Sequence, residues 1–274
     1  MNYYKTLNFS LPLAPLPATI IGGYTMYHFD VSKQFWLLNL ACFCLCTIVA
    51  ILYSRKIILP KNNNPYIILI VVTALLLSTF ISIGVENVHR WLNFKSFQLN
   101  IGLLVTPLIL IQISKINKLI HCILFATFVN VTFLLQPDAS LVTAFSLASF
   151  FIIQNKTKNK TIIVLLLQFS LFLIIYSWYN LDNLEPVSYV EGIISMTKRI
   201  SPFLYLASII ALLLLILPFI GLNSKKDSLS QALGIYFSLL LLSSFVGNFP
   251  VMIIGYGFAP IIGYYTGLIW RINT

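Results

Sequence analysis

The chain has 274 residues, of which 59% are apolar and 9% are charged, and its mean hydropathy is +0.92. Soluble domains carry charge on about a quarter of their residues, so this composition excludes a soluble globular protein and predicts an integral membrane protein. The formal net charge of +10 predicts no nucleic-acid partner, because lysines in cytoplasmic loops are the ordinary signal of membrane topology and also contact anionic membrane lipids.

Ten apolar windows, each close to the ~20 residues that a helix needs to cross a bilayer, follow one another along the chain. The short alternating segments of a β-barrel are not seen. We therefore predict an all-α polytopic membrane protein, a single transmembrane domain over residues 1–274 with about ten transmembrane helices. The predicted spans cover residues 10–29, 35–53, 66–84, 97–114, 119–135, 139–154, 161–179, 202–221, 229–247 and 251–270. The first is the weakest, because Pro12, Pro15 and Pro17 interrupt it.

The distribution of charge predicts the orientation of these spans, because Lys and Arg accumulate in cytoplasmic loops. With a cytoplasmic N-terminus, twelve of the 17 basic residues lie on the inner side: Lys5, Arg55, Lys56, Lys61, Lys115, Lys118, Lys156, Lys158, Lys160, Lys225, Lys226 and Arg271. The outer side receives six of the 7 acidic residues: Asp30, Glu86, Asp138, Asp182, Glu185 and Glu191. We therefore expect both termini to be cytoplasmic.

Three polar clusters on the predicted outer side interrupt the apolar pattern, and ionisable groups near the membrane are functional candidates because burying them in the membrane is costly. The first contains Arg90 and Trp91, after the third span, and is either an interfacial anchor or a binding site. The second is Gln136-Pro137-Asp138, between two spans with almost no loop. Pro137 ends one helix there, and we expect Asp138 to cap the N-terminus of the next.

The third outer cluster is the loop at residues 180–201, which carries Asp182, Glu185 and Glu191 before the eighth span. These carboxylates are either solvated loop charges, with Lys198-Arg199 as a surface partner, or functional groups. If Glu191 lies at the mouth of the bundle, partial desolvation makes it a candidate general base. A carboxylate there could equally bind a divalent cation, Mg²⁺ or Mn²⁺, that accompanies a phosphorylated substrate. The four cysteines and three histidines show no metal-ligand spacing, so no resident metal site is predicted.

A fourth feature is uncharged and lies in the last span. Gly255, Gly257 and Pro260 fall within six residues, a spacing that weakens a helix locally. Exposed backbone groups at membrane depth are tolerated only against protein or a wet cavity. The segment is therefore either a close-packing site of small residues or a broken helix with a function.

Taken together and in this order, these four features resemble the SEDS family (shape, elongation, division and sporulation), which includes FtsW and RodA. The family's Gly-x-Arg-Arg-Trp stretch resembles Val88-His89-Arg90-Trp91, and its Gln-Pro-Asp motif is intact at Gln136-Pro137-Asp138. In its last span, a Pro followed by Ile-Ser-Tyr-Gly-Gly-Ser is similar to Pro250 and Ile254-Gly255-Tyr256-Gly257 in the Pro, Ile, Tyr and first Gly. Its Pro-x-x-His-Thr-Asp loop is matched by Pro186 and, at the same offset, by Glu191, a carboxylate one methylene longer.

The resemblance implies a SEDS-like bundle in the bacterial inner membrane that acts in cell-wall synthesis, for cell division or cell shape. It implies a peptidoglycan glycosyltransferase that polymerises an undecaprenyl-pyrophosphate-linked sugar, a lipid II-like glycan precursor, at the outer face. Glu191 would be catalytic, and the substrate-binding residues would be Arg90, Trp91, Gln136, Asp138, Glu185, Tyr256 and Gly257. The implied partner is a single-pass transpeptidase similar to class B penicillin-binding proteins.

The chain departs from the family in two places. Gln98-Leu99-Asn100-Ile101 replaces the family's Gln-Pro-Ser-Glu, and Tyr189-Val190 replaces the His-Thr before the catalytic residue, in a shorter loop. These departures favour a second hypothesis, a catalytically inactive scaffold that binds the lipid-linked precursor. A third hypothesis is a membrane transporter or flippase, with the weakened last span lining a path through the bundle. No acidic residue falls in the middle of a predicted span, so this carrier has no evident ion site.

Overall fold

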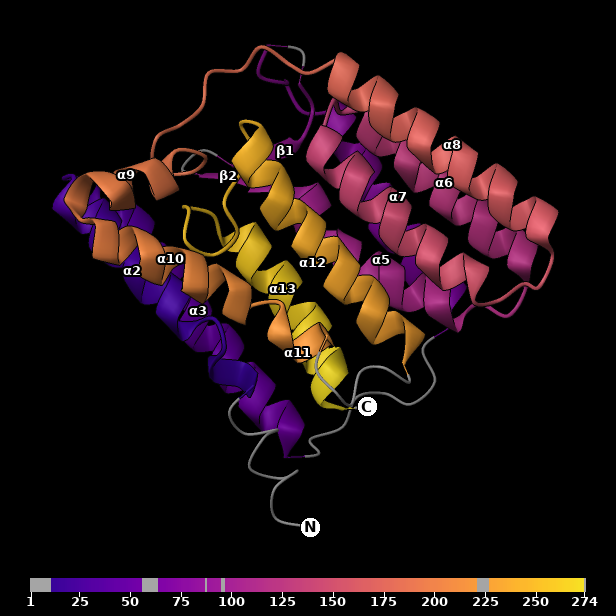
Figure 1. Ribbon diagram of the computed structural model, residues 1–274, viewed down its shortest axis with the longest axis horizontal. Coiled ribbons are helices and arrows are strands. Elements are labelled where there is room, and N and C mark those ends of the chain that lie inside the picture. Colours follow the sequence, from indigo (N-terminus) through magenta and orange to yellow (C-terminus); the bar gives the residue numbers. More distant parts are fainter. Residues whose placement is uncertain (1–10, 56–63, 87, 95–96, 221–226, 274) are drawn as a thin grey trace. The chain divides into compact units, whose positions relative to one another are not determined.

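The computed structural model describes residues 11–55, 64–86, 88–94, 97–220 and 227–273 (Figure 1). The chain is 74% helical, and two short antiparallel strands, β1 (Trp91–Phe94) and β2 (Phe97–Asn100), form a hairpin. The helical class predicted from composition is therefore confirmed, with a hairpin that the sequence did not predict. The predicted inner lysines at positions 5, 56, 61, 225 and 226 lie outside the described residues, as do Lys95 and the predicted end of the eighth span at residue 221.

Among the described residues, four helical segments are long and apolar enough to cross a membrane, with mean hydropathies between 1.7 and 2.8. Length and composition thus support a membrane protein, as predicted. The four are α3 (Lys33–Ser54), α8 (Lys160–Tyr179), the segment Pro202–Ile220, which contains α10 (Pro202–Leu214) and α11 (Leu217–Ile220), and α12 (Ser228–Val246).

The remaining helices are shorter, and several start at residues that the sequence marks as helix caps. Asn64 accepts a hydrogen bond from the Tyr66 amide at 3.0 Å and precedes a proline, which suits the first turn of a helix. Asn100 ends β2 and caps the next helix by accepting from the Leu103 amide at 3.0 Å. These helices are α2 (Leu16–His28), α4 (Pro65–Leu77), α5 (Ile101–Lys115), α6 (Leu119–Leu135), α7 (Ala139–Gln154), α9 (Ile193–Ile200) and α13 (Phe258–Ile272), with 3₁₀ turns at Leu11–Leu13 and Ser78–Phe80.

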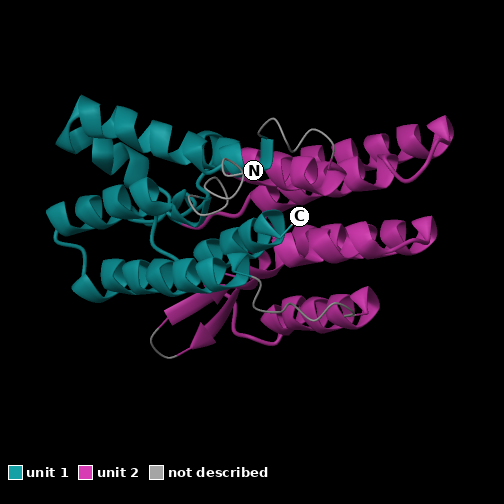
Figure 2. Cartoon of the chain, turned by 90° about the horizontal axis from the view of Figure 1, so that it is seen from below, with its two compact units in different colours: residues 1–61, 185–221, 241–274 teal, residues 62–184, 222–240 magenta. Residues whose placement is uncertain are grey.

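The chain divides into two compact units that interleave along the sequence, where we predicted a single domain (Figure 2). Unit 1 comprises residues 1–61, 185–221 and 241–274, and unit 2 comprises residues 62–184 and 222–240. In unit 1, α3 packs against α13 and α2, while α10 packs against α9 and α2. Helices from the two ends of the sequence therefore build the core of unit 1.

Unit 2 is built around α7, which packs against α5, α6 and α8. Small and apolar side chains make α7 suitable for this central place, because Ala139, Ala144 and Ala148 are completely buried and allow close helix packing. The hairpin pairs Trp91 with Asn100 and belongs to the same unit. The polar segment at residues 136–138, which we predicted to cap α7, therefore lies at one end of the central helix.

Three elements differ from the sequence-based expectation. Residues 97–100 form β2 rather than the first turn of a helix, because they pair with β1 and the rings of Phe94 and Phe97 stack at 5.0 Å. Residues 193–200, predicted as loop, form α9, a short amphipathic helix that buries Ile193 and Met196 and exposes its basic end. The last helix starts at Phe258 instead of residue 251. This late start confirms the local weakening predicted from Gly255, Gly257 and Pro260.

Candidate functional site

Arg90 lies directly before β1 and is the centre of a buried polar cluster in unit 2. Its side chain is 6% exposed, and its Nε donates to the Gln136 carbonyl at 3.2 Å. One terminal nitrogen donates to the Pro137 carbonyl and to the carboxylate of Asp182. The Asp138 carboxylate lies 3.6 Å from the Arg90 Nε. We call Arg90, Gln136, Asp138 and Asp182 the Arg90 cluster.

Asp138 has two functions in this cluster, since it pairs with Arg90 and also caps α7. Its Oδ1 accepts hydrogen bonds from the Leu141 amide at 3.0 Å and from the Ser140 hydroxyl at 2.7 Å. The predicted cap is thereby confirmed. A carboxylate at the N-terminus of a helix also interacts favourably with the helix dipole. The cap orients the carboxylate so that its second oxygen faces the guanidinium.

Gln136 is completely buried beside the same guanidinium. Its Nε2 donates to the Thr79 hydroxyl at 2.8 Å, while its Oε1 has no hydrogen-bond partner among the described residues. Trp91 adds a ring to the cluster, with the Arg90 Cζ 5.9 Å from the ring centroid, close enough for a cation–π contact. The segments that contain Arg90, Asp138 and Asp182 were all placed on the outer side from the distribution of charge. They are in direct contact within unit 2.

In the Arg90 cluster one guanidinium lies beside two carboxylates that are mostly buried. The side chain of Asp138 is 4% exposed and that of Asp182 is 14% exposed. Burying such charges is expensive, and their mutual attraction roughly repays that cost when the geometry is good. The expected role of the Arg90 cluster is therefore to hold three chain segments in one geometry, because breaking any pair would leave an uncompensated buried charge.

In unit 1, Glu191 lies in a tight turn at residues 187–192, which we call the Glu191 turn. The Val187 carbonyl accepts from the amides of Val190 at 2.9 Å and Glu191 at 3.0 Å. In return, the Val187 amide donates to the Glu191 carboxylate at 2.8 Å. The turn therefore fixes the carboxylate, whose residue is partly exposed, immediately before α9.

The segment at residues 251–257, which we call the Gly-Tyr-Gly loop, pairs with the Glu191 turn. The Tyr256 amide donates to the Tyr189 carbonyl at 3.0 Å, and the Val251 amide donates to the Val190 carbonyl at 3.3 Å. Gly255 is necessary for this approach, because a Cβ atom there would lie 2.5 Å from the Val190 oxygen. The two sequence motifs that we assigned to the catalytic loop and the last span are thus in contact within unit 1.

Asn39, on α3, holds the Gly-Tyr-Gly loop from the other direction. Its Nδ2 donates to the Gly255 carbonyl at 3.0 Å, and its Oδ1 accepts from the Gly257 amide at 3.1 Å. Gly257 has a φ of 147°, a conformation that other residues rarely adopt. The backbone of the broken segment thereby finds hydrogen-bond partners within the protein. We did not predict Asn39 as a site residue, although an amide inside an apolar span was the available signal.

Three aromatic rings lie beside the Glu191 turn. Phe35 stacks on Tyr189 with ring centroids 5.4 Å apart and contacts Tyr256 at 4.6 Å. The two tyrosine rings are 6.2 Å apart. The Gly-Tyr-Gly loop and the Glu191 turn are therefore joined by side chains as well as by backbone hydrogen bonds, and Tyr256 takes part in both.

The predicted site residues thus form two groups. Arg90, Trp91, Gln136 and Asp138 meet in unit 2, whereas Glu191, Tyr256 and Gly257 meet in unit 1. Glu185 is an exposed loop residue without a side-chain partner among the described residues. Asp182, which was not among the predicted substrate-binding residues, is a member of the Arg90 cluster.

The described residues contain no group of three or more His, Cys, Asp and Glu side chains that could hold a metal ion. The expected Mg²⁺ or Mn²⁺, which a single carboxylate would share with a phosphorylated substrate, stays a prediction, and we derive no step through it. The cysteines are free thiols, of which Cys122 is buried.

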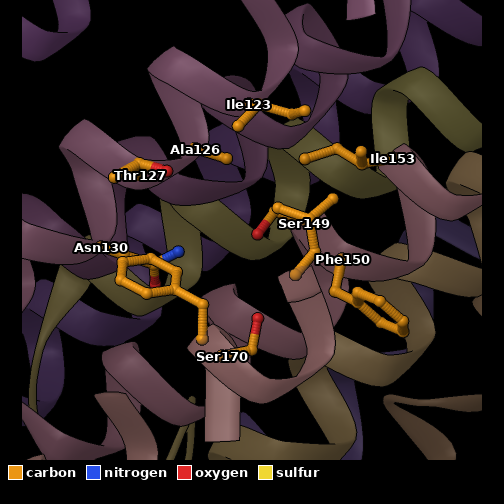
Figure 3. A pocket seen from close by; sticks show the side chains of 10 residues that line it. Ile123, Ala126, Thr127, Asn130, Ser149, Phe150, Ile153 and Ser170 are labelled. Atoms are coloured by element: carbon orange, nitrogen blue, oxygen red, sulfur yellow. The ribbon is translucent and has the colours of Figure 1, made fainter. Parts of the chain in front are cut away.

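A small cavity of about 20 Å³ lies in unit 2 between α6, α7 and α8 (Figure 3). Its polar lining includes Asn130, Ser149 and Ser170, and the Ser146 hydroxyl donates to the Asn130 oxygen at 2.7 Å. A water molecule needs about 10–15 Å³ of such space, so this cavity suits one water and is too small for a sugar.

No protein-family model and no curated protein matches the chain.

Proposed function

We propose that this chain is a SEDS-like protein of the bacterial inner membrane, with ten spans and both termini in the cytoplasm. It acts on an undecaprenyl-pyrophosphate-linked glycan precursor at the outer face of the membrane. Each of the ten apolar windows contains a helix, and four of these helical segments have the length and hydropathy of a complete span.

One observation carries the proposal: the Glu191 turn pairs with the Gly-Tyr-Gly loop. Tyr189 and Tyr256 are 67 positions apart, yet the backbone of one accepts from the other at 3.0 Å. The two motifs that carry the resemblance in the C-terminal half are therefore one structural element. A partly exposed carboxylate beside aromatic rings suits recognition of a sugar hydroxyl, because the rings supply apolar surface and the carboxylate accepts the hydroxyl proton.

In this proposal Glu191 acts as the general base. Its carboxylate removes the proton from the acceptor sugar hydroxyl, whose oxygen then bonds to the anomeric carbon of the donor. The bond from that carbon to the lipid pyrophosphate breaks, and the lipid pyrophosphate leaves with the electron pair. We predicted Arg90 as a substrate-binding residue, but its guanidinium is buried and bonded to Pro137 and Asp182. We assign it to holding the Arg90 cluster together instead of binding the substrate.

The test is polymerisation of fluorescent lipid II by the purified full-length chain in detergent with Mg²⁺ or Mn²⁺. Wild type should form glycan ladders, and Glu191→Gln should abolish them, because the amide keeps the shape of the side chain without its basicity. Asp30→Asn is the matched control, since Asp30 is an exposed carboxylate of unit 1 that was not predicted to bind substrate, and it should leave the ladders intact. Ladders of equal yield from Glu191→Gln would refute the assignment of the base.

A second candidate function is a scaffold that binds the precursor without polymerising it, together with a single-pass transpeptidase. The hydrogen bond from the Val187 amide to Glu191 favours this reading, because it occupies one carboxylate oxygen within the residue's own turn. Saturable binding of labelled lipid II in the absence of ladders would support the scaffold. Absence of both binding and ladders would reject both functions.

A further inference from the structure

Helix α8 exposes one amide side chain in the middle of a membrane-spanning segment. Gln168 lies about 12 Å from the start of a helix about 30 Å long, at 1.5 Å per residue. That distance places it near the centre of the hydrocarbon layer. Gln168 is exposed, and its side chain has no hydrogen-bond partner among the described residues.

Amide side chains in the middle of other described helices are buried, unlike Gln168. Asn39, Gln112 and Asn130 are 3%, 2% and 5% exposed, so they lie inside the protein. A polar group without a partner in hydrocarbon is costly, and polar residues in membrane helices therefore face protein or water. The exposed position of Gln168 thus indicates that another protein surface covers it in the membrane.

The neighbours of Gln168 extend this position into a regular stripe. Thr161, Val164, Gln168, Leu171 and Ile175 are separated alternately by three and four residues, and all are exposed. This is the spacing with which two helices pack side by side along their length. We call these five residues the α8 stripe. Apolar side chains flank the single amide at the centre of the stripe, and the hydroxyl of Thr161 lies at its N-terminal end.

The opposite side of α8 is already occupied within unit 2. Ser170, Leu173 and Ser177 are buried, and the Trp178 indole donates to the Thr143 hydroxyl of α7 at 2.8 Å. Figure 1 shows α8 alongside α7, with which it makes its main helix contact. The α8 stripe is consequently available for a partner without disturbing the packing of the unit.

We propose that the α8 stripe is a dimer interface between two copies of this chain, held at its centre by hydrogen bonds between the two Gln168 side chains. A second copy is the occupant that the chemistry favours, because a glutamine amide is self-complementary: it donates through NH₂ and accepts through C=O. A two-fold axis along the membrane normal brings the same residue of both copies to the same depth. A single polar residue in an apolar helix seam is also a known way to specify register and partner.

The test is Förster transfer between differently labelled full-length chains in liposomes, diluted with lipid to give a dissociation constant. Wild type should dimerise, and Gln168→Leu should weaken dimerisation by roughly three- to thirtyfold, the range expected for interhelical hydrogen bonds in membranes. The control is Leu167→Ala, one position away and outside the stripe, which should leave the constant unchanged. The tryptophan fluorescence of each variant, to which Trp178 contributes, checks that unit 2 keeps its fold.

Cysteine cross-linking in native membranes gives a second readout. In a Cys44→Ser background, which removes the exposed native thiol, Ile175→Cys should cross-link two chains and Leu167→Cys should not. A wild-type chain that stays monomeric at all dilutions would overturn the proposal, and so would a Gln168→Leu dimer of wild-type affinity. Cross-links from Ile175→Cys to a different protein, with no cross-link between copies, would also overturn it in favour of a hetero-partner.

Discussion

The guanidinium of Arg90 bonds to the carboxylate of Asp182, a residue 92 positions further along the chain. The same guanidinium bonds to the backbone of the turn that joins α6 to α7. One side chain therefore connects the segment before the hairpin, the central helix of unit 2 and the start of the acidic loop. Loss of any one of these contacts should therefore destabilise the other two segments as well.

Replacement of Arg90 by Met should lower the free energy of unfolding by about 3–5 kcal/mol, because two buried carboxylates then lose their counter-charge. Asp182→Asn should cost less, since Asp182 is the more exposed carboxylate and Asp138 remains beside Arg90. Thermal unfolding in detergent, followed by helix circular dichroism, measures both. Arg199→Met, at an exposed position, is the control and should stay within about 0.5 kcal/mol of wild type. An Arg90→Met protein as stable as this control would show that the cluster does not hold the unit together.

The two functions of Asp138 can be separated by two substitutions. Asp138→Asn keeps an oxygen that can cap α7 but loses the charge that faces Arg90, whereas Asp138→Ala loses both. The alanine variant should therefore be less stable than the asparagine variant by about 1 kcal/mol, the usual value of a helix cap. Hydrogen exchange of the Leu141 amide reports the cap directly and should accelerate only in the alanine variant. Equal exchange in both variants would contradict the assignment of the cap.

Adjacent glycines in α2 should respond in opposite directions to the same substitution. A Cβ atom at Gly22 would lie 2.2 Å from the Ile254 carbonyl oxygen, while one at Gly23 would meet nothing within 4 Å. Gly22→Ala should destabilise unit 1 by about 1–3 kcal/mol through overpacking against the Gly-Tyr-Gly loop. Gly23→Ala should stabilise α2 by up to ~1 kcal/mol, since alanine is the better helix former. Thermal unfolding of the two variants side by side is the measurement, and equal effects would refute the close contact.

The sequence predicted helices best where hydropathy alone determines their length. Residues 119–135 and 139–154 match α6 and α7 at both ends, because polar or helix-breaking residues bound each apolar run. The cap by Asp138 was also predictable, since it depends on a local motif. The hairpin at residues 91–100 was not predictable from the sequence. Its strands are short, and residues 97–100, which pair with β1, were assigned by their hydropathy to the start of a span.

The candidate site was predictable only as separate motifs. Charge placed Arg90 and Asp182 on the same side, but their direct contact depends on how α7 positions the intervening chain. Asn39 was missed because an amide in an apolar span is usually interpreted as packing, and its two bonds to residues 255 and 257 are long-range contacts. Gln168 carried the same signal, an amide inside an apolar span, but only the structure distinguishes its exposed face from the buried one.

The interleaving of the two units determines the order in which the chain can assemble during synthesis. Helices α4 to α8 are contiguous, so they can associate as soon as they leave the ribosome. Helix α3, by contrast, packs on α13, and about 200 residues separate them. At 5–20 residues per second, α3 therefore waits roughly 10–40 s for its partner, with Asn39 unsatisfied in the meantime. Nascent α2 and α3 are thus the part of this protein that most needs an insertase or a membrane chaperone.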